Sequence, residues 1–412
     1  MALAACTAVS PAMAQKAATD VPFVSRLEQT RTMLQLDETG LHGLGAVVLA
    51  EAIAASRYVL IGEDHLSREI PQFTTGVCRL MTPGGLDAFA VEIGPEAARV
   101  VNENLRRNDR ISRLATFMHA HPDAFAFQNG RDESDMAAEC ARLAGPQFQI
   151  WGLDQEFFGA AGHLFEQMLT AQPGSTARVA IEKLAVADRT ATAKALASGS
   201  VGDLFVYQIT DRELSDAGLA IKRDGGNRVS ALFDALTETR AIYLGQNTDG
   251  FASNGRRARL MKRTLVRYLD ARPRRTRVLF KFGDAHMGKG INGLGQRDLG
   301  NFVAERAEGE DAGSLHIAVY GAKGIHALYG GVGRQVRLEP FVMTEDAEYA
   351  WLKDVLPPGQ QSGSKDWVVV DLRPLRAKMP SDISAAWRNV VRRYDLVVVA
   401  PELTPSSLIG SK

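Results

Sequence analysis

The chain has 412 residues, of which 45% are hydrophobic and 23% charged, a composition typical of folded globular proteins and not of disordered or fibrous ones. Its 48 basic and 48 acidic residues give a formal net charge of zero, so electrostatics favours neither a nucleic acid nor an anionic membrane surface as a partner. The length predicts two domains, or one large domain with an insertion.

The first segment of the chain, residues 1–20, has the character of a leader. It is rich in small and apolar residues, and the triplet Ala-Met-Ala ends at Ala14, before Gln15, which is a signal-peptidase pattern. We therefore predict a signal peptide and a secreted or periplasmic protein. The segment LAAC, which ends at Cys6, resembles a lipoprotein box, so a lipid anchor at Cys6 is the alternative. No later apolar run has the length of a membrane span.

Seven apolar runs rich in β-branched residues recur along the chain, and most are followed by helical patterns. Because they are apolar on both faces, they predict strands of a parallel sheet that is covered by helices on each side. The predicted fold class is therefore α/β, with a mostly parallel central sheet flanked by helices. The runs are 58–62, 88–94, 148–154, 277–284, 315–321, 367–372 and 395–401.

The longest interruption of this pattern runs from 156 to 270, where helical patterns dominate. We predict a large helical insertion between the third and fourth core strands, which caps one end of the sheet. Residues 21–155 would form the first half of the α/β core and 271–407 the second half, with 408–412 as a tail. The chain is expected to be loose after Thr404. A Pro/Gly/Ser-rich loop is expected at 356–366.

The remaining cysteines and several histidines give weaker signals. Cys78 and Cys140 permit one disulfide without implying it, and the chain has no CxxC or Cys/His metal spacing. Cys78 lies on an apolar helical face that is typical of a core. His119 and His121 lie in a loop-like segment and are interpreted as surface residues, with a lid or substrate contact as the alternative. His163 is interpreted as structural.

Polar residues gather at the ends of the predicted strands. In open parallel sheets ligands bind at the carboxyl ends of the strands. A carboxylate in an apolar run, such as Glu92, is costly unless it is paired, and His65 or Arg68 would serve as its partner. For Asp154, capping of the next helix is the simpler interpretation. The strand-end residues are Glu63, Asp64, His65, Glu92, Asp154, Gln155, Glu156, Asp284, His286 and Lys289.

Taken in order, these segments resemble the motifs of the erythromycin esterase-like hydrolases. GEDHLSREI resembles the first motif of that family, AFAVEIG its buried glutamate strand and IWGLDQE its GxD strand. RRARLM matches an R-x-R-x-M pattern that opens a long helix, and RVLFKFGDAHMGKG resembles the strand end that carries a second histidine. The resemblance runs from about residue 45 to 407. The GxxH pattern from Gly62 to His65 also fits a wider superfamily that includes ChaN-like haem-iron proteins and TIKI/TraB-type proteins.

The resemblance implies an ester or lactone hydrolase that uses activated water. His65 would be the general base, Glu92 would orient it, and His286 would be a second acid/base or would donate to the oxyanion. Arg68 would hold Glu92 or the substrate carbonyl, and Glu63 would also belong to the catalytic set. The residues expected to contact the substrate or to support the catalytic set are Asp64, Glu69, Asp154 and Asp284.

Two other functions use the same residues. His65, Glu92 and His286 would form a plausible ligand set for zinc or manganese, which would make the protein a metal-dependent hydrolase or peptidase. A non-catalytic protein that binds haem or iron, with His65 as an axial ligand, is the third hypothesis. The leading hypothesis requires no cofactor and expects a small-molecule substrate as the partner.

Overall fold

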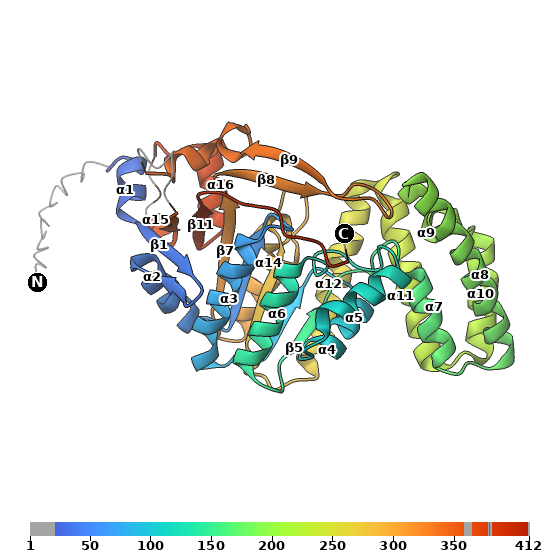
Figure 1. Ribbon diagram of the computed structural model, residues 1–412. Helices are drawn as coiled ribbons and strands as arrows, with labels where there is room; N and C mark the ends of the chain where they lie inside the picture. Colours follow the sequence, from blue (N-terminus) through green and yellow to red (C-terminus); the bar gives the residue numbers. More distant parts are fainter. Residues whose placement is uncertain (1–20, 358–364, 378, 380, 411–412) are drawn as a thin grey trace, which may run out of the picture.

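The computed structural model describes residues 21–357, 365–377, 379 and 381–410 (Figure 1). The predicted signal peptide with Cys6, and most of the predicted loop at 356–366, lie outside these residues. The described chain is an α/β protein with a nine-stranded sheet in the order β2-β1-β10-β11-β7-β3-β6-β4-β5. None of the described helices is long and apolar enough to cross a membrane.

All seven predicted runs form strands of this sheet, so the predicted fold class is confirmed. Six neighbouring strands from β11 to β5 are parallel, and β10, β1 and β2 add an antiparallel edge. The strands are β1 (Arg31–Asp37), β2 (Gly40–His42), β3 (Tyr58–Glu63), β4 (Ala88–Val91), β5 (Gln149–Gly152), β6 (Val278–Gly283), β7 (Ser314–Gly321), β10 (Trp367–Asp371) and β11 (Leu396–Ala400).

Helices cover both faces of the sheet because alternate residues of each strand point to opposite sides. Val59 and Ile61 of β3 pack with helices α2, α3, α4 and α6, whereas Tyr58 and Leu60 pack with α12 and α14. The core helices are α1 (Phe23–Gln29), α2 (Leu44–Ala54), α3 (Glu69–Met81), α4 (Pro95–Asn104), α5 (Arg110–Ala120), α6 (Arg131–Ala144), α13 (Asp284–Met287), α14 (Leu299–Gly309), α15 (Arg373–Ala377) and α16 (Ala385–Arg393).

The predicted helical insertion lies between β5 and β6, the third and fourth core strands. Its first five helices, which we call the helical arm, share a hydrophobic core of their own and extend away from the sheet (Figure 1, green). The last helix instead packs Met261, Leu265 and Leu269 against the sheet. The insertion contains α7 (Ala161–Thr170), α8 (Ser175–Ser198), α9 (Phe205–Gln208), α10 (Asp211–Asp224), α11 (Gly226–Gln246) and α12 (Gly250–Asp270).

A hairpin that the sequence did not predict runs from the sheet to the helical arm (Figure 1, orange). It pairs β8 (Lys323–Leu328) with β9 (Arg337–Val342). In its connecting loop Val332 is fully buried in the core of the arm, and the Val332 backbone N–H donates to the Gly199 carbonyl at 3.0 Å.

The C-terminal tail packs on the core up to Gly410, its last described residue. The backbone N–H of Thr404 donates to Glu69 at 2.7 Å, and the Ser406 hydroxyl donates to Asp132 at 2.6 Å. Ile409 is 7% exposed. The tail therefore lies against α3 and α6, where its polar groups find partners.

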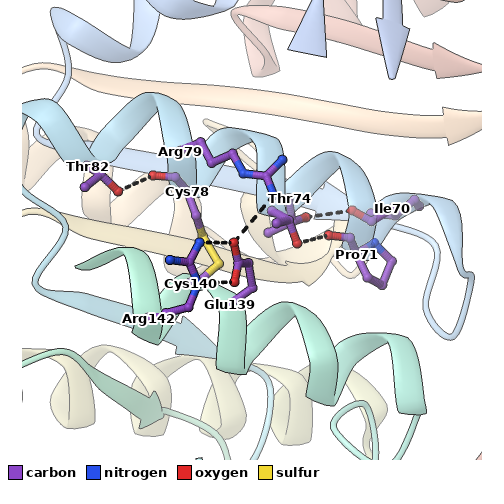
Figure 2. The surroundings of a disulfide bond; sticks show 10 residues. Ile70, Pro71, Thr74, Cys78, Arg79, Thr82, Glu139, Cys140 and Arg142 are labelled. Atoms are coloured by element: carbon purple, nitrogen blue, oxygen red, sulfur yellow. Dashed lines mark hydrogen bonds and ion pairs between the residues drawn. A yellow bond between two sulfur atoms is a disulfide. The ribbon is translucent and has the colours of Figure 1, made fainter. Parts of the chain in front are cut away.

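Cys78 of α3 and Cys140 of α6 form a disulfide with a Cα–Cα distance of 5.5 Å (Figure 2). Both side chains are fully buried, so the prediction that Cys78 belongs to the core is confirmed. The sequence permitted the disulfide without implying it, and the structure contains it. The bond closes a loop over a sequence separation of 62. In the chain-entropy model such a loop stabilises the fold by about 4 kcal/mol.

Candidate functional site

Three adjacent parallel strands, β3, β6 and β4, bring their carboxyl ends together at one edge of the sheet. Glu63 is the last residue of β3, and His286 lies in α13, which directly follows β6. Glu92 comes immediately after β4, since the strand ends at Val91. Glu92 therefore lies at the strand end and not within the strand, as the apolar run 88–94 had suggested.

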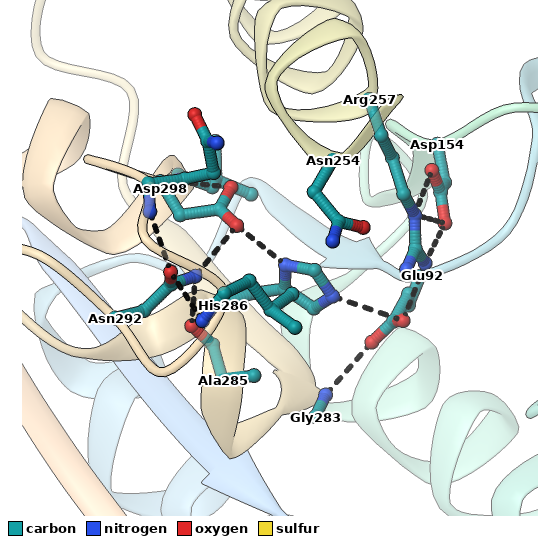
Figure 3. A network of polar contacts seen from close by, with 12 residues as sticks. Glu92, Asp154, Asn254, Arg257, Gly283, Ala285, His286, Asn292 and Asp298 are labelled. Carbon is teal, nitrogen blue, oxygen red and sulfur yellow. Dashed lines mark hydrogen bonds and ion pairs between the residues drawn. The ribbon is translucent and has the colours of Figure 1, made fainter. Parts of the chain in front are cut away.

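Glu92 is the centre of the site. It is 6% exposed, and its Oε2 accepts the backbone N–H of Gly283 at 2.8 Å. The Nε2 of His65 lies 3.3 Å from Oε2, and the Nε2 of His286 lies 3.5 Å from Oε1 (Figure 3). Burial favours the neutral acid, but His286, His65 and Arg257 together lower the pKa of Glu92 well below its ordinary value. Glu92 is therefore a carboxylate between two imidazoles.

His65 is held by a second carboxylate and by an aromatic ring. Its Nδ1 lies 2.9 Å from Oε1 of Glu63, and the ring of Phe127 stacks on it with centroids 3.9 Å apart. Phe127 has φ 58°, a backbone conformation that is uncommon for a bulky residue. Burial opposes the charge of His65, but Glu92 and Glu63 outweigh it and raise the pKa of the imidazole to about 10. His65 is therefore an imidazolium near neutral pH.

Glu63 has a buried cationic partner, Lys281, in the middle of β6. Lys281 is 3% exposed, and its ammonium group contacts Oε1 of Glu63. Glu133 of α6 is fully buried nearby, and burial raises its pKa to about 7, partly offset by Lys281. The signal for this pair in the sequence is a lysine inside the apolar run RVLFKFGD. A buried charge is costly unless it is paired, so Lys281, like Glu92, needs a partner of opposite charge.

His286 has a carboxylate partner of its own. Its Nδ1 lies 2.8 Å from Oδ2 of Asp298, the residue that caps α14. Asn292 donates to the same oxygen at 3.0 Å and to the Ala285 carbonyl at 2.8 Å (Figure 3). Burial opposes the charge of His286, but Glu92 outweighs it and raises the pKa of the ring. Each histidine thus has an acid at Nδ1 and shares Glu92 at Nε2.

Arg257 of α12, and not Arg68, is the guanidinium that holds Glu92. Its Nη2 lies 2.7 Å from Oε1 of Glu92, and its Nε donates to Asp154 at 3.0 Å (Figure 3). The Arg68 side chain is 54% exposed and lies 3.9 Å from Asp132. This corrects the expected role of Arg68, which begins the helix on the side of the C-terminal tail.

Three other predicted residues bind neighbouring segments instead of Glu92. Asp64 lies 2.8 Å from Nδ1 of His326 on β8, and Glu69 accepts from the C-terminal tail. Asp284 accepts from the Tyr320 hydroxyl at 2.9 Å. The structure thus brings together Glu63, His65, Glu92, Asp154 and His286 from the predicted set.

A cavity of about 200 Å³ opens against the site. Glu92, Asp154 and Arg257 form its polar wall, and the rest is mainly apolar and aromatic. The aromatic lining consists of Phe125, Phe127, Phe157 and Tyr243. The cavity therefore offers space for a small apolar group beside a polar wall.

Four residues of this site had not been assigned a role from the sequence. Arg257 lies in the RRARLM segment, whose resemblance to a family motif was the available signal. Lys281 was visible as a charge in an apolar strand, and Asp298 as a helix-capping residue. Nothing in the sequence indicated that Phe127 would stack on His65.

No family model matches the chain, and no curated protein matches its sequence. Solved structures with a similar fold include an erythromycin esterase mutant, EreC, in its open conformation, with a TM-score of 0.61 and 15% identity over 88% of this chain and 95% of that one. A succinoglycan biosynthesis protein has a TM-score of 0.60 and 15% sequence identity, over 93% of this chain and 97% of that one. A Bacillus cereus protein has a TM-score of 0.57 and 10% sequence identity, over 93% of this chain and 98% of that one. The chain therefore has the erythromycin esterase-like fold.

Proposed function

We propose that the protein hydrolyses an ester or lactone with a water molecule activated by His65. The observation that carries the proposal is the pair of carboxylate-bound histidines whose Nε2 atoms face the two oxygens of the buried Glu92. The similarity of fold to an erythromycin esterase supports a hydrolase.

The first step is proton transfer from water to Nε2 of His65 while the water oxygen attacks the carbonyl carbon. Glu63 fixes the ring through Nδ1, and Phe127 fixes its plane. Because the pKa of His65 is raised to about 10, the reactive form is the minority neutral imidazole. A base with such a pKa is strong when it is deprotonated, which offsets its low population.

The second step is collapse of the tetrahedral intermediate. His286, oriented by Asp298, would donate from Nε2 to the developing oxyanion, and a positioned donor of this kind is worth roughly 10² to 10³ in rate. His65 would then return its proton to the leaving oxygen, which gives a carboxylic acid and an alcohol. Glu92 stabilises both imidazolium ions during the cycle.

The substrate would be small. The cavity of about 200 Å³ lies below the range of about 300 to 1,000 Å³ that is usual for drug-sized ligands. Its aromatic walls favour an apolar acyl or alcohol group, and Arg257 on the polar wall favours a carbonyl oxygen.

A panel of p-nitrophenyl esters and lactones tests the proposal. We expect hydrolysis of the smaller esters, and a loss of roughly 10² to 10⁴ in kcat/KM for His65→Ala and His286→Ala. Activity that both variants retain would contradict the assignment. A metal-dependent mechanism predicts instead that EDTA abolishes activity, that Zn²⁺ or Mn²⁺ restores it, and that metal binding is lost in His65→Ala.

The proposed mechanism needs neither a metal nor haem, and the atoms that either group would use already have partners within the protein. Both oxygens of Glu92 accept from Gly283 or Arg257. Both ring nitrogens of His65 face carboxylates, so an axial bond to haem iron would replace one of these contacts.

We also propose that the protein is exported. The buried disulfide between Cys78 and Cys140 supports this proposal, since disulfides persist mainly in oxidising compartments.

A further inference from the structure

A second cluster of metal-ligating side chains lies where the core meets the helical arm. His121 follows the core helix α5, whereas His163 and Glu166 lie on α7 of the arm. Nε2 of His121 is 3.1 Å from Oε2 of Glu166. One ligand atom from each of the three residues lies within 4.8 Å of the other two. His163 and Glu166 are three positions apart, so they share one face of the helix.

The surroundings of this cluster leave polar groups unsatisfied. His163 is 5% exposed, and its Nε2 has no hydrogen-bond partner among the described residues. Such an unpaired buried group is unfavourable, because it has given up its hydrogen bond to water without replacing it. Asp188 of α8 is also buried, at 7% exposed, and the described part of the chain provides it with no hydrogen bond or ion pair.

The backbone leaves room for these groups at Gly162. A Cβ atom on that residue would lie 2.7 Å from Oδ2 of Asp188 and 3.7 Å from Nδ1 of His121. A side chain at 162 would thus displace the Asp188 carboxylate. A cavity of about 330 Å³ borders Gly162, His121, Glu166 and Asp188, which gives an ion a path to the cluster.

We propose that His121, His163 and Glu166 bind a zinc ion, with Asp188 as the fourth ligand. Two imidazoles and carboxylate oxygens form a ligand set that suits tetrahedral zinc. Ligand atoms around such an ion are about 3.3 Å apart, so the three clustered side chains must contract slightly, and Asp188, which lies outside that group, must move toward them. The Glu166 side chain is 65% exposed and is free to make that movement.

The ion would join the core to the helical arm. His121 belongs to the segment that leads to Phe125 and Phe127, both of which line the substrate cavity. The other ligands belong to α7 and α8. Bound zinc would therefore hold segment 121–127 against the arm and restrict the movement of the ring that stacks on His65. Its role is structural, and its binding does not depend on the proposed hydrolysis.

Zinc titration of the full chain, stripped of metal with a chelator, tests the proposal by calorimetry. We expect one zinc site that raises the Tm, and affinity at least about 100-fold weaker in His163→Ala and in Glu166→Gln. His119→Ala is the matched control, because His119 is an exposed histidine two residues from His121, and it should bind zinc like the wild type. Co²⁺ bound in place of zinc should give the visible absorption of a tetrahedral site.

The choice of variants distinguishes loss of the zinc site from loss of folding. Glu166 is exposed, so Glu166→Gln tests the site even if His163→Ala does not fold, and circular dichroism checks both. His65→Ala should retain zinc binding. Affinity unchanged in Glu166→Gln and in a folded His163→Ala, absence of zinc binding at micromolar free Zn²⁺, or loss of binding in His65→Ala alone would each overturn the proposal.

Discussion

Arg257 and Glu92 are separated by 165 positions in the sequence, yet Nη2 of the arginine lies 2.7 Å from Oε1 of the glutamate. The arginine comes from the last helix of the insertion, and the glutamate from the end of a core strand. The insertion therefore contributes directly to the polar wall of the site.

Arg257→Ala should lower both activity and stability. Removing Arg257 leaves the buried Asp154 without its cationic partner and Glu92 with only its two histidines, and breaking a buried ion pair typically costs about 3 to 5 kcal/mol. We expect a lower Tm by differential scanning calorimetry and a decrease of roughly 100-fold in kcat/KM. Arg257→Lys should recover little, since an ammonium group cannot make the forked contact to both acids. Arg68→Ala is the control and should change neither Tm nor kcat/KM much. A large loss of activity in Arg68→Ala together with a small one in Arg257→Ala would show that Arg68 is the arginine of the site.

The pH–rate profile should rise through the neutral range. The pKa of His65 is about 10 in the folded protein, so the neutral base increases roughly tenfold per pH unit below that value. We expect kcat/KM for a p-nitrophenyl ester, corrected for spontaneous hydrolysis, to increase between about pH 7 and 9 and to level off near 10. A profile that is flat in this range and falls above pH 10 would show instead that the imidazolium form is the active one.

Stability should decrease over the same interval. His65 has a higher pKa in the folded state than the value of about 6.5 expected for an unfolded chain. Its contribution is fully present below pH 6.5 and is lost as the pH rises from 6.5 through about 10. Urea unfolding from pH 6 to 10 measures this loss. In His65→Gln the slope of the unfolding free energy against pH should be smaller, and an equal slope would assign the effect to other groups.

Phe127→Ala should impair catalysis more than folding. The stacked ring fixes the plane of His65, and a base that can rotate is less often in the reactive geometry. We expect kcat/KM to fall by about tenfold with a small change in Tm. Phe251→Ala is a matched control, because Phe251 is 65% exposed. Equal effects of the two substitutions would remove the argument for a positioning role.

Loss of the disulfide should destabilise the protein without removing the site. The Cys78→Ala/Cys140→Ala double variant should unfold at lower urea concentration, with a decrease of about 4 kcal/mol in the free energy of unfolding. The bond joins α3 to α6 (Figure 2) and does not involve the residues around Glu92, so activity at 25 °C should persist. Wild type treated with a reductant should behave like the double variant.

The sequence predicted the elements whose residues are buried along their whole length. Runs such as 58–62 and 395–401 are apolar on both faces, and they form central strands. β9 and the edge strand β2 contain few or no buried residues, so their sequences carry no apolar signal. Their pairing depends on where the sheet and the arm are placed, which is a tertiary effect.

The residues of the candidate site that lie at strand ends could be predicted from the sequence. Glu63, His65, Glu92 and His286 follow from the rule that parallel strands end at one edge. Arg257 comes from a distant helix, and its contact with Glu92 is fixed only when α12 packs on the sheet through Met261 and Leu265. Strand-end reasoning on its own cannot supply such a residue.

The β8–β9 hairpin attaches the helical arm to the rest of the molecule at a point other than its incoming and outgoing chain (Figure 1). A lobe that is joined only by its incoming and outgoing chain can rotate about the line through those two joints. Val332 is buried in the core of the arm, so the hairpin tip is anchored there and resists that rotation. Transplanting this arm onto another sheet of the same fold would therefore require moving the hairpin tip with it.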